Sequence, residues 1–285
     1  MQRSDFRFFE QLRVRWAEVD MQRIVFNGHY LMYFDTAVAG YWRALALPYA
    51  VTMEHLNGDL FVRKATLEYL GSARYDDLCD VGMRVARIGN SSISFVGAVF
   101  RGEQLLVHGE LIYVFADPAT QTSRPVPQAL RDVLLGFEAG EAMVEVRVGN
   151  WAELGAKAQD IRRAVFTDEQ GFAAAMDQDE SDLGATHALA FNRFGLPLAT
   201  GRLLTVVPRV GKIGRMAVVQ NLRGSGIGKA VVQALMAQAQ QLGLHEVILH
   251  TPPSTASFYT RQGFVQRGEA FHEAGISHLE LARRP

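Results

Sequence analysis

Residues 216–235 read MAVVQNLRGSGIGKAVVQAL, in which an apolar strand, a turn with three glycines and an amphipathic helix follow one another. Glycine at 224, 226 and 228 lets backbone amides approach a ligand closely, and the positive end of the helix points into the same place. The stretch therefore predicts a diphosphate-binding turn. The stretch lacks the Lys-Ser/Thr pair of a P-loop, which argues against an NTPase. Glu246 is only a loose match to the acidic residue of a dinucleotide site. A plain tight turn without a ligand is the alternative.

The segments on both sides of this turn alternate between strand and helix patterns. A strand begins at residue 143, a helix is expected over 152–166, and three strands lead to the turn. The helix after the turn is followed by a strand, a short helix and a final strand. This order predicts a mixed α/β domain over residues 143–285.

On the motif Arg/Gln-x-x-Gly-x-Gly/Ala, which residues 223–228 fit, this half resembles the GNAT family of acetyl-CoA-dependent N-acetyltransferases. The resemblance implies that acetyl-CoA is a substrate and that backbone groups of Met216, Ala217 and Val218 pair with its pantetheine arm. It also implies that the turn and the helix start hold the pyrophosphate, through Arg223, Gly224, Ser225, Gly226, Gly228 and Lys229. An exposed helix lysine is the alternative for the last of these.

The segment ASFYTRQGF at 256–264 resembles a helix of the same family whose tyrosine protonates the departing CoA thiolate, and Tyr259 occupies that place. A thiolate leaving group needs a proton donor, and a phenol with an ordinary pKa near ~10 stays protonated at neutral pH. A packed aromatic is the alternative. Six side chains are candidates to line the amine site, each with a structural contact as its alternative: Glu169, Gln170, Asp182, His187, His272 and His278.

The first half of the chain has the pattern of one long helix and a run of strands. A strand over 10–18 and an apolar helix over 27–45 precede four strand patterns separated by Gly, Asn and Asp turns. This order predicts an α+β domain over residues 1–140, with an antiparallel sheet around a central helix. Residues 125–137 predict a closing helix, and EAGEA at 138–142 predicts a linker.

Asp20 ends the first predicted strand and lies seven residues before Asn27, where the long helix begins. A carboxylate in a loop that faces a helix N-terminus suits acyl chemistry. Unpaired amides at Asn27, Gly28 and His29 polarise a carbonyl while Asp20 attacks it or activates water. An ordinary turn or capping carboxylate is the alternative.

From RVRWAEVD at 13–20 to PVPQALR at 125–131, this half resembles the hotdog-fold acyl-CoA thioesterases of the 4-hydroxybenzoyl-CoA thioesterase type. The resemblance implies a catalytic carboxylate at Asp20, acting as nucleophile or general base, and a carbonyl-polarising amide at Asn27. Where the family usually has glycine three residues after the aspartate, this chain has Arg23. The resemblance also implies dimers or tetramers with active sites at protomer interfaces.

The composition limits the class of protein. The 285 residues are 48% hydrophobic with a formal net charge of −1, which gives no electrostatic case for nucleic acid or anionic lipid as a partner. The single cysteine, Cys79, excludes an internal disulfide and is expected to be an inert apolar residue, and no Cys/His spacing predicts a metal. No apolar run reaches the ~20 residues of a membrane span and no signal-peptide pattern is present, so a cytoplasmic location is expected.

Three functions follow from these patterns. The leading hypothesis is a homo-oligomeric, bifunctional CoA enzyme that hydrolyses an acyl-CoA thioester in the hotdog domain and transfers acetyl from acetyl-CoA to a small-molecule or peptide amine in the GNAT domain. In the alternative, favoured by Arg23, the hotdog half is an oligomerising or acyl-CoA-sensing module and only the GNAT half is catalytic. In the third, both halves only bind CoA.

Overall fold

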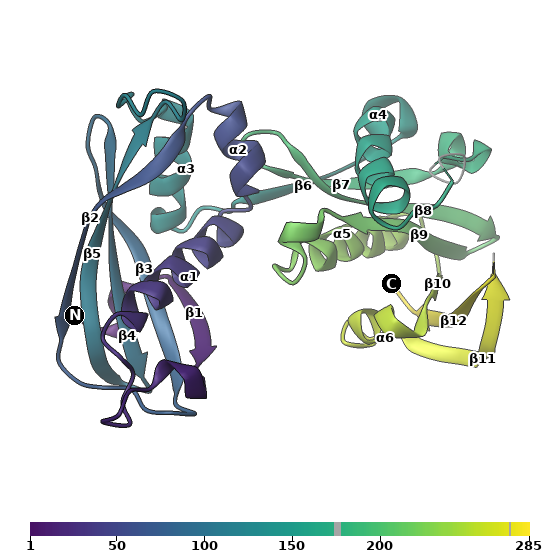
Figure 1. The fold of residues 1–285 in the computed structure, drawn as a ribbon. Coiled ribbons are helices and arrows are strands. Elements are labelled where there is room, and N and C mark those ends of the chain that lie inside the picture. Colours follow the sequence, from purple (N-terminus) through teal and green to yellow (C-terminus); the bar gives the residue numbers. More distant parts are fainter. Residues whose placement is uncertain (174–177, 274) are drawn as a thin grey trace. The chain divides into compact units, whose positions relative to one another are not determined.

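The computed structural model describes residues 1–173, 178–273 and 275–285, and it divides into two compact units, Met1–Met143 and Val144–Pro285 (Figure 1). Each unit contains one β-sheet with helices packed against it. Within the described ranges, no helix combines the length and the apolar character that a membrane crossing requires. No group of three or more His, Cys, Asp or Glu side chains in these ranges is placed to hold a metal ion.

The first unit is a five-stranded antiparallel sheet in the order β1-β3-β4-β5-β2. Its strands are β1 (Phe8–Arg13), β2 (Asp59–Tyr69), β3 (Leu78–Ile88), β4 (Ser92–Arg101) and β5 (Gln104–Ala116). Its helices are η1 (Arg3–Asp5), η2 (Trp16–Glu18), α1 (His29–Ala44), α2 (Tyr49–His55) and α3 (Gln128–Ala139). The predicted antiparallel sheet with a central helix is confirmed. The strand predicted over 10–18 is wrong beyond Arg13, and α2 is a helix that the sequence patterns do not predict.

Helix α1 packs closely on the sheet because two glycines leave room for one of its rings. Phe34 is fully buried, and Gly97 of β4 lies opposite Gly109 of β5. A Cβ atom at Gly97 would lie 2.9 Å from the Phe34 ring, and one at Gly109 would lie 3.0 Å from it. The facing glycines therefore set the distance between α1 and the sheet, and with it the position of the α1 N-terminus.

The end of the first unit differs from the sequence prediction. Helix α3 continues into the predicted linker 138–142. Glu138 Oε1 accepts hydrogen bonds from Tyr41 Oη at 2.6 Å and from Val85 N at 2.8 Å, which holds α3 against α1 and β3. The helix ends at Ala139 and is capped by Gly140, whose φ of 92° is the left-handed conformation typical of a helix C-terminus.

The second unit is a seven-stranded sheet in the order β11-β12-β10-β9-β8-β7-β6, in which β9 and β10 run parallel. Its strands are β6 (Val144–Gly149), β7 (Thr186–Asn192), β8 (Pro197–Val207), β9 (Val210–Val218), β10 (Glu246–Thr251), β11 (Val265–Glu273) and β12 (Ile276–Arg283). Its helices are α4 (Trp151–Arg162), the π-helix η3 (Arg163–Glu169), η5 (Glu180–Gly184), η6 (Gln220–Leu222), α5 (Ile227–Gln241) and α6 (Pro253–Thr260). The predicted mixed α/β layout is confirmed.

Helices α4 and α5 cover opposite faces of this sheet (Figure 1). Two neighbouring residues of β8 show the alternation. Arg202 points to the α4 face, where it binds Asp182, to which Arg162 of α4 also donates. Gly201 points to the α5 face, since a Cβ atom there would lie 2.9 Å from Leu235 Cδ1. Residues paired across two strands share a face, so the register assigns the other strands' side chains to one helix or the other.

Candidate functional sites

The residues around Asp20 form a tight turn. Asp20 N donates to Ile24 O at 2.9 Å, Arg23 N donates to Asp20 O at 2.9 Å, and Val19 pairs with Val25. Arg23 has a φ of 61°, in the left-handed region that glycine adopts without strain. The turn expected to need glycine is therefore made with arginine, at a backbone cost of about 1 kcal/mol.

Two carboxylates near this turn have different environments. The Asp20 side chain is half-buried, and its Oδ1 accepts a hydrogen bond from Gln22 N at 2.8 Å. Glu18 is buried and accepts hydrogen bonds from Arg15 N and Tyr33 Oη, each at 2.8 Å. Burial alone would raise the pKa of Glu18, but these hydrogen bonds and the Arg15 charge hold it below its ordinary value. Glu18 thus ties the segment before Asp20 to α1, a positioning role that no sequence pattern indicates.

Asn27 lies just before α1, on the second arm of the turn. Its carbonyl accepts a hydrogen bond from Tyr69 Oη at 3.2 Å, whereas the amides of Asn27 and Gly28 find no acceptor within the described part of the chain. Free amides beside a helix N-terminus are donors for a carbonyl oxygen. The segment from Asp20 to the start of α1 therefore carries a half-buried carboxylate, that of Asp20, and two free amides.

Two histidines and the cysteine of the first unit are engaged in structural contacts or buried. His108 Nε2 lies 3.3 Å from a carboxylate oxygen of Glu68, and His29 Nδ1 lies 3.3 Å from Met32 Sδ. Cys79 is buried, and burial raises the pKa of its thiol to about 11. Because the thiolate is the reactive form, Cys79 is inert at neutral pH, as predicted.

In the second unit, β9 and β10 separate after a short parallel pairing. The last pair is Ile213 with Leu249. Beyond it, Gly214, Ala217 and Val218 of β9 pair with β8, and none of the described residues 214–218 pairs with β10. Arg215 has a φ of 53° and lies at a bulge in the β8–β9 pairing. The free edge comprises the residues predicted to bind pantetheine, Met216, Ala217 and Val218. Such an edge offers N–H and C=O groups to an extended ligand.

The turn after β9 presents unpaired amides at the N-terminus of α5. Gly224 and Gly226 have φ values of 84° and 88°, in the left-handed region. The amides of Gly224 and of residues 226–229 have no acceptor within the described ranges. The amide and the hydroxyl of Ser225 instead both donate to Leu222 O, at 3.4 and 2.6 Å. Amides converging at the positive end of a fifteen-residue helix form an anion-binding arrangement.

Gly228 has a different task from the first two glycines. It is buried, and a Cβ atom there would lie 3.2 Å from Val218 Cγ2 and 3.4 Å from Phe258 Cζ. Its absence of a side chain therefore lets α5 begin close to both β9 and α6. Lys229 beside it is exposed, which leaves its ammonium accessible to a phosphate.

The side chain of Arg223 is engaged within the protein. Its Nη1 and Nη2 donate to the two carboxylate oxygens of Glu169 at 2.6 Å each, and its Nε donates to Val218 O at 3.1 Å. The hydrogen bonds from Arg223 lower the pKa of Glu169. Glu169, a candidate for the amine site, thus anchors η3 to the glycine turn. Of the other candidates, Gln170 and His272 are exposed.

Tyr259 lies on α6 and is 8% exposed. Burial raises the pKa of its phenol to about 12. The ring packs against Phe258 and Phe264, and the hydroxyl makes no hydrogen bond within the described part of the chain. A protonated hydroxyl without a partner is suited to donate to a leaving group.

Asp182 and His187, also candidates for the amine site, lie in a buried charge network instead. Asp182 accepts hydrogen bonds from Arg162 Nη1 at 2.9 Å and from Arg202 Nη1 at 2.8 Å. His187 Nε2 is 2.9 Å from Asp182 O, and Arg162 Nη2, which only donates, is 3.4 Å from His187 Nδ1. The ring is therefore neutral, and burial lowers its pKa. Their prediction as amine-site residues is wrong, because both are fully buried.

A histidine that no sequence pattern indicates lies where β9 and β10 separate. His250 Nδ1 is 3.0 Å from Lys212 Nζ on β9, and its Nε2 is 3.3 Å from Glu280 Oε2 on β12. Phe271 of β11 packs edge-on against His250, with ring centroids 4.8 Å apart, and stacks on His278. These five side chains come from four neighbouring strands, so only the sheet register brings them together.

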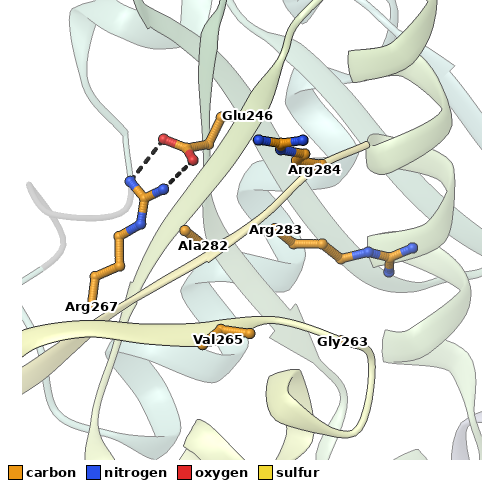
Figure 2. Close-up of a pocket in the computed structure, with 7 residues that line it drawn as sticks. All are labelled: Glu246, Gly263, Val265, Arg267, Ala282, Arg283 and Arg284. Carbon is orange, nitrogen blue, oxygen red and sulfur yellow. Dashed lines mark hydrogen bonds and ion pairs between the residues drawn. The ribbon is translucent and has the colours of Figure 1, made fainter.

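A pocket of about 380 Å³ lies at the start of β10, at the other end of that strand from His250 (Figure 2). Its lining consists of Glu246, Gly263, Val265, Arg267, Ala282, Arg283 and Arg284. Figure 2 shows the guanidinium of Arg267 paired with Glu246, and the Nη1–Oε2 distance is 2.8 Å. The pocket is separate from the free edge of β9, which lies beyond the last β9–β10 pair.

Comparison with known proteins bears on both units. A family model described as thioesterase superfamily matches residues 22–112, and one described as acetyltransferase (GNAT) domain matches residues 158–284. The Bacillus subtilis protein named "Putative acetyltransferase BSU40680" is 32% identical over 128 residues, which are 44% of this chain and 86% of that protein. The chain carries a thioesterase-superfamily domain followed by a GNAT acetyltransferase domain.

Most of the candidate site residues lie inside the residues that these two family models match, but Asp20 does not. In the thioesterase domain, Asn27 lies inside the matched residues and Asp20 just before them, whereas the GNAT match includes the glycine turn and Tyr259. Escherichia coli O6:H1 acyl-CoA thioester hydrolase YbgC is 23% identical over 120 residues, 42% of this chain and 89% of that protein. The crystal structure of Slr0204, a 1,4-dihydroxy-2-naphthoyl-CoA thioesterase from Synechocystis, is 15% identical and covers 45% of this chain and 95% of that one, with a TM-score of 0.42.

Proposed function

We propose that the protein is a CoA enzyme with two active sites, which hydrolyses an acyl-CoA thioester in the thioesterase domain and transfers acetyl from acetyl-CoA to an amine in the GNAT domain. The observation that carries the second activity is the free edge of β9 leading directly into the unpaired amides of the glycine turn. That sequence of backbone groups suits an extended pantetheine arm followed by a diphosphate.

The direction of the arm follows from the order of these groups. With the diphosphate at the turn after Val218, the pantetheine runs back along β9 toward Met216, so its acetyl end approaches the point where β9 and β10 separate. The amine nitrogen then attacks the thioester carbonyl carbon and CoA departs. Because burial raises the pKa of Tyr259 to about 12, the phenol keeps its proton for the leaving thiolate.

Replacing Gly226 by alanine should weaken acetyl-CoA binding about tenfold, because a side chain at φ 88° strains the turn and moves its amides away from the diphosphate. Gly243, just after α5, is the matched control, since it has a φ of 68° and, like Gly226, no atom within 4 Å of an added Cβ. Titration calorimetry with acetyl-CoA compares the two variants. Equal affinities in Gly226→Ala and Gly243→Ala would remove the turn from the binding site.

Replacing Tyr259 by phenylalanine should slow acetyl transfer about 10²-fold without changing acetyl-CoA affinity, because the thiolate then takes its proton from water. The wild-type rate should show no loss from tyrosine ionisation up to about pH 10, since the phenol pKa is about 12. Release of CoA thiol with a panel of primary amines measures both. Hydrolysis by the thioesterase domain of the same variant is the internal control, and a full transfer rate would contradict the acid role.

In the thioesterase domain, the Asp20 carboxylate attacks the thioester carbonyl carbon or takes a proton from the water that does so. Either route breaks the C–S bond and develops negative charge on the carbonyl oxygen. The free amides of Asn27 and Gly28 are the donors that stabilise this charge. The opposing proposal, a module that binds acyl-CoA without hydrolysis, rests on Arg23, which takes a left-handed φ of 61° in place of the glycine expected there.

We further propose that β2 joins two copies of the chain. It is an eleven-residue edge strand that pairs with β5 on one side, and it exposes Val62 by 53% and Tyr69 by 50%. A long edge strand presents unpaired backbone N–H and C=O groups that can pair with another strand. Val62→Lys should therefore shift the protein to the monomer in analytical ultracentrifugation. Val265→Lys, at a 69% exposed position of the GNAT domain, should not, and an unchanged mass in Val62→Lys would contradict this interface.

A further inference from the structure

Three side chains on neighbouring strands form a chain of polar contacts at the separation of β9 and β10. Lys212 Nζ lies 3.0 Å from His250 Nδ1, and His250 Nε2 lies 3.3 Å from Glu280 Oε2. We propose that Lys212 is an acetylation site of the protein itself, with His250 as the base that takes its proton. This inference rests on the proposed transfer of acetyl from acetyl-CoA.

The polarity of the contacts is set by what each group can donate. An ammonium only donates, so His250 Nδ1 accepts from Lys212. The ring proton is then on Nε2 and is donated to the Glu280 carboxylate. The carboxylate orients the histidine, and the histidine lies next to the amine. This is the arrangement of a catalytic triad, in which Lys212 takes the place of the serine or cysteine nucleophile.

The register places this group next to the expected acetyl end of the bound arm. The last β9–β10 pair is Ile213 with Leu249, so His250 is the first β10 residue beyond the pairing. The arm that binds residues 216–218 approaches this same point from the glycine turn. Lys212 Nζ, in contact with His250, is a half-buried amine on a flexible four-carbon stem at the place where the two strands separate.

The amine and the proposed acid lie on opposite faces of the sheet. Lys212 pairs with Leu204, two residues from Arg202, so its side chain is on the α4 face. Helix α6 is on the α5 face, because Phe258 lies against Gly228 of α5. Tyr259 of α6 is therefore on the side of the sheet opposite to Lys212. A thioester between the strands can be attacked from one face while its thiolate is protonated from the other.

The reaction needs no further reactant. The ammonium of Lys212 gives one proton to His250 Nδ1, and the freed nitrogen lone pair attacks the acetyl carbonyl carbon. The C–S bond breaks, the nitrogen loses its second proton to solvent, and the thiolate takes a proton from Tyr259, which solvent restores. His250 then releases to solvent the proton that it took from Lys212. The products are CoA thiol and a neutral acetylated Lys212, which no longer holds a charge beside His250.

The chain contains its own set of control lysines. It has four lysines, Lys64, Lys157, Lys212 and Lys229. Lys64 is in the thioesterase domain, Lys157 lies over the Phe191 ring with its Nζ 5.0 Å from the centroid, and Lys229 is exposed on α5. Acetylation by free acetyl-CoA in solution favours the exposed amines, whereas the proposed reaction favours half-buried Lys212.

The full-length protein is incubated with acetyl-CoA alone, and acetylation of each lysine is followed by peptide mass spectrometry. Acetyl should accumulate on Lys212 at least about tenfold faster than on Lys64 or Lys157. His250→Gln should slow acetylation of Lys212 about 10²-fold, the range of a general base. Glu280→Gln, which keeps an acceptor but loses the charge, should slow it less, and Lys157→Arg should leave the Lys212 rate unchanged.

Acetyl-CoA affinity, measured by calorimetry on each variant, separates the possible failures. Equal acetylation of all four lysines, or an unchanged rate in His250→Gln with acetyl-CoA bound, overturns the assignment of Lys212 and leaves the proposed acetyltransferase standing. Absence of any acetyl-CoA binding to the wild type overturns the proposed function, and the acetylation site with it.

Discussion

Acyl-CoA hydrolysis should fall about 10³–10⁴-fold when Asp20 is replaced by asparagine, because the side chain then neither attacks a carbonyl carbon nor accepts a proton from water. Asparagine has nearly the same shape. It also keeps an oxygen for the hydrogen bond that Gln22 N donates to Asp20 Oδ1 at 2.8 Å, so the turn should persist. The loss should therefore appear in the rate constant of hydrolysis and not in the stability of the domain.

CoA thiol release from acyl-CoA thioesters of several chain lengths and one aryl thioester, without amine, measures this effect. Asp5→Asn is the matched control, since the Asp5 carboxylate also accepts a local backbone amide, that of Gln2 at 2.8 Å, and lies outside the turn. Hydrolysis that survives in Asp20→Asn for every thioester would remove Asp20 from the reaction. Absence of hydrolysis by the wild type with every thioester would make the first domain a binding or oligomerising module. That is the outcome that Arg23 in the turn favours.

The sequence predicts those parts of the fold that depend on local periodicity. The long helix α1, the later strands of the first sheet and the strand, turn and helix around Gly226 all follow from side-chain spacing. The predicted linker at 138–142 is wrong at its start because Glu138 is held by Tyr41 and Val85, which are 97 and 53 residues away. A short acidic segment without apolar periodicity has the sequence pattern of a linker. Only the distant hydrogen-bond partners of Glu138 show that the segment's first residues belong to the helix.

The same division between local and distant contacts applies to the sites. Ligand binding by consecutive backbone amides leaves a local pattern, so the glycine turn is visible in the sequence. His250 has no such pattern, because its partners Lys212 and Glu280 lie 38 and 30 residues away on neighbouring strands. Asp182 is the opposite case, because the sequence makes it a candidate for the amine site. The structure shows that it is buried and bonded to Arg162, which lies 20 residues away in the chain.

That contact leads to the largest expected effect on stability. Asp182→Asn should lower the free energy of unfolding of the GNAT domain by about 3–5 kcal/mol, the usual result of breaking a buried ion pair. Asp182 is fully buried and accepts hydrogen bonds from Arg162, Arg202 and the amide of Asp179. The asparagine removes one negative charge and leaves two buried guanidinium groups, with the Asp179 carboxylate bonded to Arg202 at 2.7 Å.

Hydrogen–deuterium exchange of β7 and β8 peptides measures this free energy in the GNAT domain alone. Glu145→Gln is the control, because Glu145 is an exposed partner of Arg147 at 2.7 Å and its loss should leave exchange unchanged. Equal exchange in Asp182→Asn and Glu145→Gln would show that the buried arginines do not depend on Asp182.

The pH dependence of exchange gives a second test of the same residue. Burial alone would raise the pKa of Asp182, but the hydrogen bonds from Arg202, Asp179 N and Arg162 hold it below its ordinary value. A carboxyl with a lowered folded pKa stabilises the fold above its unfolded pKa of about 4, and this stability is lost as the pH falls through the folded pKa. The wild-type domain should therefore weaken below about pH 4, and Asp182→Asn, which has no proton to gain there, should weaken less.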